Sequence, residues 1–120
     1  MALELIGMKR AVQGLWSPDL DPPSDGVPPD IEDFALFVQV AVGKGGEAGH
    51  EVFGFSVCSP TALARVEAGM FISHALVLKR FDWGAIRARV EKLLMHVQSC
   101  EEWECVIKRL AGTLEYADQW

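Results

Sequence analysis

The sequence lacks the features of a nucleic-acid-binding or membrane protein. Its 11 Lys and Arg residues are outnumbered by 17 Asp and Glu residues, which leaves a formal charge of −6 and a pI near 4.9. Phosphate binding requires clustered basic residues, so a nucleic-acid partner is disfavoured, whereas a basic partner would be attracted. No apolar run is long enough to cross a membrane. Glu4, Lys9, Arg10 and Gln13 interrupt the N-terminal segment, so we expect no secretory signal.

Cysteine is also scarce, with Cys58, Cys100 and Cys105 the three present. An odd number of cysteines within predicted strands and helices suits a reducing compartment, so we expect a cytoplasmic protein whose thiols act as small apolar side chains. Cys100 and Cys105 are five residues apart, and on one helix they would point to different faces. The spacing therefore predicts neither a disulfide nor a zinc site at this pair.

No group of residues forms a strong catalytic or metal-binding motif. Cys58 with His50 or His74 is the one candidate nucleophile and base, but a Cys that ends an alternating strand is far more often a core residue. His50, His74 and His96 lack the spacing of zinc-binding helices. We therefore predict a protein that is not an enzyme and uses no metal or cofactor.

The length and composition are those of one packed domain. Half of the 120 residues are apolar and 23% are charged, so we expect a single domain over residues 1–120. Ser17–Pro29 is dense in Pro and Gly, which predicts a stiff surface loop. Residues 2–16 fit either an amphipathic helix or a bent strand, and periodicity alone leaves both open.

Two alternating segments around a Gly-rich turn predict a β-hairpin, Asp33–Val42 followed by Glu51–Cys58. The alternation places Phe34, Leu36, Val38, Val40 and Val42 on one face of the first segment, and Phe53, Phe55 and Val57 on one face of the second. Ser59-Pro60 then predicts a helix start, with Ser as N-cap, and Gly69 predicts its end. Met70–Phe81, rich in Ile, Val and Leu, predicts a further strand.

The last part of the chain predicts two helices. Asp82 is an N-cap residue for the first, and Ser99 with Glu102 resembles a capping box for the second. We predict that Trp83 and Trp103 of these helices, like Cys58, belong to the core. The order β-β-β-α-β-α-α indicates an α+β fold with an antiparallel sheet of about four strands and three helices.

Acidic residues are concentrated in the loop, with no basic residue from Ser17 to Val42. The loop residues that could meet a partner are Asp19, Asp21, Asp25, Asp30 and Glu32, and Asp33 follows them. A second acidic group consists of Glu101, Glu102, Glu104, Glu115 and Asp118. The simpler interpretation of these acidic residues is a solvated face that keeps the protein soluble. The more specific interpretation is a stiff acidic surface that binds a basic partner.

The most specific motif covers the second strand and the helix start after it, Glu51-x-Phe53-x-Phe55-x-Val57-Cys58-Ser59-Pro60-x-x-Leu63. Further motifs are Ser17-Pro18-Asp19, Asp33-Phe34 through Val38-Gln39 to Val42-Gly43, Phe81-Asp82, Ser99 with Trp103, and Glu115-Tyr116 followed by Asp118. Together they resemble the Immunity protein 8 family over most of the chain. Leu114, where an aromatic residue is expected, and Met70–Leu78 depart from the family pattern.

The resemblance implies an α+β fold that begins with a strand, and an immunity protein of a bacterial polymorphic toxin system. Such a protein binds a cognate protein toxin and neutralises it by occupying it, without catalysis. Many such toxins are nucleases with basic grooves, which an acidic inhibitor would fit. The alternative class is an acidic secretion chaperone or adaptor, which usually begins with a helix. An enzyme or ligand-binding domain would need a polar pocket. The oligomeric state stays open.

Overall fold

A computed structural model describes residues 10–44, 50–65 and 74–117. Its elements are β1 (Arg10–Trp16), β2 (Ala35–Lys44), β3 (His50–Cys58), α2 (Pro60–Leu63), β4 (Ala75–Val77), α3 (Trp83–Leu94), the 3₁₀ turn η1 (Met95–Val97), α4 (Trp103–Leu110) and β5 (Glu115–Tyr116). This order confirms the predicted α+β fold and adds β5 near the C-terminus. The first described element is a strand, and the predicted helix end at Gly69 lies outside the described residues.

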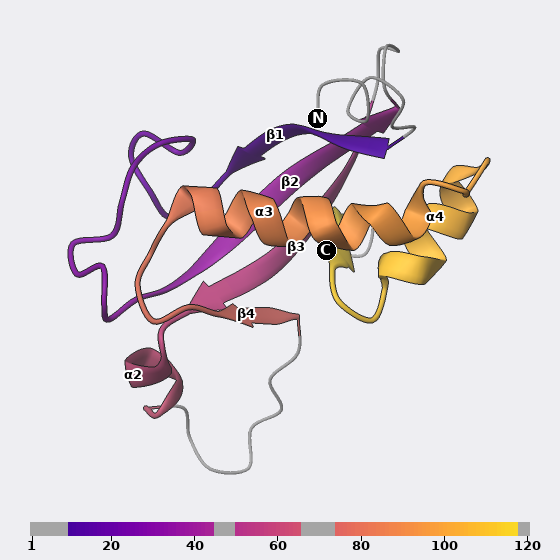
Figure 1. Ribbon diagram of the computed structural model, residues 1–120. Helices are drawn as coiled ribbons and strands as arrows, with labels where there is room; N and C mark the ends of the chain where they lie inside the picture. Colours follow the sequence, from indigo (N-terminus) through magenta and orange to yellow (C-terminus); the bar gives the residue numbers. More distant parts are fainter. Residues whose placement is uncertain (1–9, 45–49, 66–73, 118–120) are drawn as a thin grey trace.

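The strands form one sheet in the order β1-β2-β3-β4 (Figure 1). The short strand β5 pairs with β3 as well. The pairs β1–β2, β2–β3 and β3–β5 are antiparallel. β4 runs parallel to β3, which differs from the antiparallel sheet expected. The reason is the connection: β3 and β4 are joined by residues 59–74, which begin with α2, and a crossover of this kind returns the chain in the same direction.

The core lies between the sheet and α3, which crosses one face of it (Figure 1). The side chains that the alternation placed on one face of each segment are all buried, namely Phe34, Leu36, Val38, Val40, Val42, Phe53, Phe55 and Val57. Ile86, Val90 and Leu94 of α3 are buried against this cluster. Cys58 is buried as predicted. Trp83 and Trp103 are half-buried and pack against the core. The prediction that both are buried core residues is therefore only partly correct.

Two of the three predicted helix starts are confirmed. Ser59 Oγ accepts a hydrogen bond from Ala62 N at 3.1 Å, and Asp82 Oδ1 accepts one from Gly84 N at 2.8 Å. The capping box at Ser99 is wrong, because α4 begins at Trp103 and its N-cap residue makes no side-chain hydrogen bond. Ser99 Oγ instead accepts a hydrogen bond from Arg109 Nη1 at 3.3 Å.

Cys100 and Cys105 form a disulfide, so the prediction that their spacing excludes one is wrong. The prediction assumed one helix through both residues. Cys100 in fact precedes α4, and the chain bends there so that the two Cα atoms lie 5.6 Å apart, within the usual range for a disulfide. Arg10 holds this bend against β1, because its Nη2 donates to the carbonyl of Cys100 at 3.1 Å. A disulfide also removes the argument for a reducing compartment that rested on these cysteines. Among the helices that the structure describes, none has the length and apolarity of a membrane span.

Candidate functional site

The acidic loop between β1 and β2, residues 17–34, is tied to β2 by side chains that replace a strand. β1 ends where Trp16 pairs with Gln39, and two residues further along β2, at Phe37, the loop takes the place of β1. Ser17 Oγ donates to the carbonyl of Phe37, and Asp19 Oδ2 accepts from its N–H at 2.8 Å. The Ser-Pro-Asp motif therefore completes the sheet edge and determines where the loop departs.

Two aromatic residues, Phe81 and Trp83, anchor the middle of the loop to the start of α3. Trp83 Nε1, at the start of α3, donates to the carbonyl of Gly26 at 2.8 Å, and Phe81 N donates to the carbonyl of Ile31 at 2.7 Å. The ring of Phe81 packs edge-on against those of Trp83 and Phe34, with centroids 5.3 and 5.5 Å apart. Gly26 sits in a tight turn, where an added Cβ would lie 2.5 Å from the carbonyl oxygen of Pro22. The loop is thus a fixed surface.

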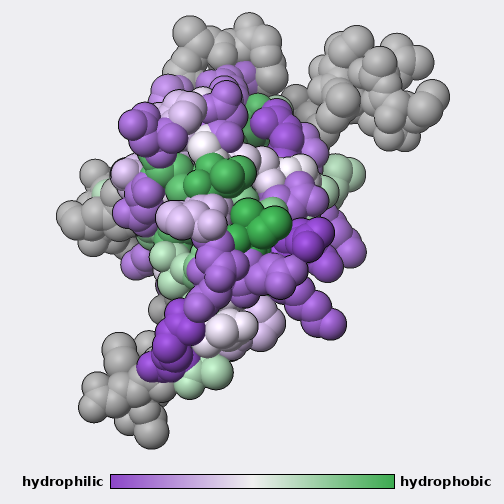
Figure 2. Space-filling view, turned by 90° about the vertical axis from the view of Figure 1, so that its left-hand side faces the viewer, coloured by the Kyte–Doolittle hydropathy of each residue, from purple (hydrophilic) through white to green (hydrophobic). Residues whose placement is uncertain are grey.

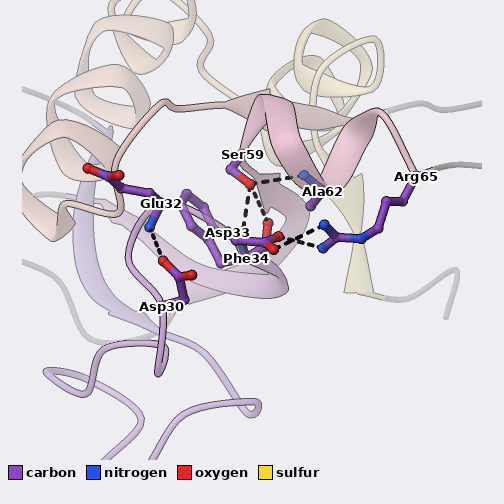
Figure 3. A network of polar contacts seen from close by, with 7 residues as sticks. All are labelled: Asp30, Glu32, Asp33, Phe34, Ser59, Ala62 and Arg65. Atoms are coloured by element: carbon purple, nitrogen blue, oxygen red, sulfur yellow. Dashed lines mark hydrogen bonds and ion pairs between the residues drawn. The ribbon is translucent and has the colours of Figure 1, made fainter.

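The end of the loop is joined to α2 through Ser59 and Arg65 (Figure 3). Besides capping α2, Ser59 Oγ accepts from Phe34 N at 3.1 Å and donates to Phe34 O at 3.4 Å, which uses the full capacity of the hydroxyl. Asp33 makes a two-pronged ion pair with Arg65, one contact of which spans 3.0 Å. Hydrogen bonding to Arg65 holds the pKa of Asp33 below its ordinary value.

The five predicted partner-binding residues are all exposed, but they differ in what they contact. Asp21 and Asp25 make no hydrogen bond or ion pair with any described residue. Asp30 accepts the N–H of Glu32 at 2.9 Å and has no cation beside it among the described residues. Asp19 is engaged by Phe37, and Glu32 is paired with Arg80 at 3.1 Å. Within the described part of the chain, the uncompensated charges of the loop are therefore those of Asp21, Asp25 and Asp30.

Two apolar residues of the loop were missed in the sequence. Val27 is 60% exposed and Ile31 is 37% exposed, both between aspartates. Figure 2 turns the end of the molecule with the loop toward the viewer and shows hydrophobic groups enclosed by hydrophilic ones. An apolar centre with a charged rim is typical of protein–protein interfaces. The sequence did contain a signal of their exposure, because Val27 and Ile31 lie in an irregular segment without the periodicity of a strand or helix that buries one face.

The second acidic group is more dispersed. Glu101, Glu102 and Glu104 border a shallow hollow near the disulfide, together with Lys108 and Arg109. Glu104 is paired with Lys108 at 3.1 Å, so part of this charge is compensated. Glu115 lies apart from them in β5, and Asp118 lies outside the described residues. The structure therefore does not gather these residues into one negative surface.

Comparison with known proteins decides the family. The model of the Immunity protein 8 family matches residues 11–118. The chain belongs to the Immunity protein 8 family. It is thus an immunity protein of a toxin system, and its partner is a cognate toxin. No curated protein and no solved structure matches the chain.

The one catalytic candidate of this Immunity protein 8 chain lacks the chemistry of a nucleophile. Burial raises the pKa of the Cys58 thiol, whereas a nucleophilic thiol needs a lowered pKa. His50 is at the opposite end of β3, and His74 Nε2 bonds to the carbonyl of Ala111 at 2.8 Å. Within the described residues, no three His, Cys, Asp or Glu side chains converge to hold a metal. Members of immunity protein families are typically non-catalytic.

Proposed function

We propose that this Immunity protein 8 chain neutralises its toxin by covering it, without catalysis, and that the loop of residues 17–34 is the contact surface. The observation that carries the proposal is a rigid loop in which Asp21, Asp25 and Asp30 have no counter-ion among the residues that the structure describes, around exposed Val27 and Ile31. The other two acids predicted to bind, Asp19 and Glu32, hold and frame this surface through their contacts with Phe37 and Arg80.

Rigidity favours binding because an ordered surface loses little conformational entropy when it meets its partner. The loop is anchored on both sides, at Phe37 of β2 and at Trp83 of α3. Its charge increases the association rate with a basic partner, and its apolar residues can be desolvated at the centre of the contact. These properties fit a toxin with a basic substrate groove, and we propose a nuclease as the toxin.

The alternative, an acidic secretion chaperone or adaptor, fits the structure less well. Such chaperones usually begin with a helix, whereas the first element that the structure describes, residues 10–16, pairs with β2 as the edge strand of the sheet. An enzyme is disfavoured by the buried thiol of Cys58, whose pKa is raised.

The test replaces three uncompensated acids together, as Asp21→Asn, Asp25→Asn and Asp30→Asn. The Asn at position 30 keeps an oxygen for the N–H of Glu32, so the loop should retain its fold. The matched control carries Glu102→Gln, Glu104→Gln and Glu115→Gln, which changes net charge equally but away from the loop. Association with the toxin encoded beside the immunity gene is measured across a salt series.

We expect the loop variant to associate with the toxin at least about tenfold more slowly at low salt, and with a weaker salt dependence. The control should retain most of the wild-type rate, because its charges lie outside the contact. Equal rates for both variants would show that the loop is only a solvated connection. Inhibition of the toxin should be complete at one chain per toxin, since covering the toxin requires one chain for each.

A further inference from the structure

A second hollow lies away from the acidic loop, and residues of α3, β4 and the turn that joins α4 to β5 line it. Its volume is about 190 Å³. Its walls are mainly apolar, formed by Phe55, Leu76, Val90, Leu93 and Leu114. Pockets that hold a complete small molecule usually measure about 300–1,000 Å³, so this hollow has room for one large side chain and excludes a nucleotide or other large cofactor.

Arg89 supplies the charge at this hollow. Its guanidinium forms no ion pair or hydrogen bond with the residues that the structure describes. Arg87 of the same helix, in contrast, is paired with Glu91 at 3.5 Å. None of the described residues around the hollow is acidic. An apolar cavity beside an uncompensated cation is complementary to an apolar group that carries a carboxylate.

His74 lines the hollow and has a strained backbone conformation. Its φ is 54°, in the left-handed region that residues other than glycine seldom adopt. Its Nε2 lies 2.8 Å from the carbonyl oxygen of Ala111, and because a carbonyl only accepts, Nε2 carries the proton. Its Nδ1 is buried and has no hydrogen-bond partner in the described part of the chain. Strained backbone and unsatisfied buried polar atoms are concentrated at functional sites.

We propose that this hollow is a second contact point for the protein partner, and that it takes one large apolar side chain flanked by a carboxylate, which pairs with Arg89. The proposal rests on the proposed function, in that it assumes a protein partner. It differs in location and in charge, because the loop attracts basic groups and this hollow accepts an acidic one. A partner that contacts both would be fixed in orientation, since each contact rejects the charge that the other accepts.

The hollow can be tested without the toxin, by titrating small probes into the full-length protein and following its amide resonances. N-acetylphenylalanine presents an aromatic side chain beside a carboxylate, and N-acetylphenylalaninamide is its neutral match. N-acetyl-aspartyl-phenylalaninamide moves the carboxylate to a neighbouring side chain, which distinguishes a chain terminus from an internal acid. We expect the carboxylated probes to bind with Kd on the order of 1 mM and to shift Leu76, Leu93 and Leu114.

Arg89→Gln should weaken binding of the carboxylated probes about threefold to fivefold and leave the neutral probe unchanged. Arg87→Gln is the matched control, because it removes the same charge from the same helix without lining the hollow. In the toxin complex, Arg89→Gln should raise the dissociation rate more than Arg87→Gln does. The proposal is overturned if no probe shifts residues of the hollow, or if Arg89→Gln binds the charged and neutral probes as wild type does. The loop experiment above would still decide the proposed function.

Discussion

The carboxylate of Asp19 accepts a hydrogen bond from the backbone N–H of Phe37 at 2.8 Å, beyond the point where β1 stops pairing with β2. Asp19, which the sequence predicted as a partner-binding residue because of its charge, thus has a structural role at the sheet edge. Asp19→Ala should lower the free energy of unfolding by about 1 kcal/mol, the usual net contribution of one such hydrogen bond. Asp25→Ala is the control and should change it by less than about 0.5 kcal/mol. Urea unfolding measures both, and equal effects would contradict the assigned role.

Trp83→Phe tests whether rigidity of the loop matters for binding. The change preserves an aromatic ring beside Phe81 but removes the N–H that donates to the carbonyl of Gly26. We expect a loss of about 1 kcal/mol of stability and faster amide hydrogen exchange at Gly26. Toxin association should slow, because the loop must then be ordered on binding. If exchange quickens while association is unaffected, a preformed surface is not required.

The disulfide should contribute to stability through the short loop that it closes. The cysteines are five residues apart, and chain-entropy arguments for so small a loop give about 2 kcal/mol. Dithiothreitol should therefore lower the unfolding midpoint of the wild type, and it should leave Cys100→Ser/Cys105→Ser unchanged. A thiol count under denaturing, non-reducing conditions should find Cys58 alone. Three reactive thiols per chain would disprove the bond.

The ion pair of Asp33 and Arg65 should make the stability of the protein depend on pH in the acidic range. Hydrogen bonding to Arg65 holds the pKa of Asp33 below 3.8, its ordinary value. A lowered folded-state pKa stabilises the fold at pH above the ordinary value, and this contribution disappears as pH falls through the folded-state pKa. The unfolding midpoints of wild type and Arg65→Gln should therefore differ at neutral pH, and they should converge as the pH falls through the folded-state pKa of Asp33. A carboxyl titration by NMR should show the Asp33 pKa rising in Arg65→Gln.

The two hairpin strands, β2 and β3, and two of the three helix starts were readable from the sequence, because the signals involved are local, whereas periodicity left residues 2–16 open between a helix and a strand. Alternation of apolar residues has a period of two, so Val38, Val40 and Val42 indicate their buried face without reference to the rest of the chain. The N-caps at Ser59 and Asp82 depend on residues two or three positions away. The family motifs are also local, and they led to the family that covers residues 11–118.

Which acids are paired with a cation depends on contacts between segments that are far apart in the sequence. Arg65 neutralises Asp33, and Arg80 neutralises Glu32, across 32 and 48 residues of sequence, whereas Asp21 and Asp25 meet no cation in the described part of the chain. The disulfide was missed for a related reason: Cys100 lies in a bend outside α4, where Arg10 binds its carbonyl, and not on the helix that local spacing suggested. Local periodicity specifies which face of an element is buried, but the partner of a charge or thiol depends on which distant segments the fold brings together.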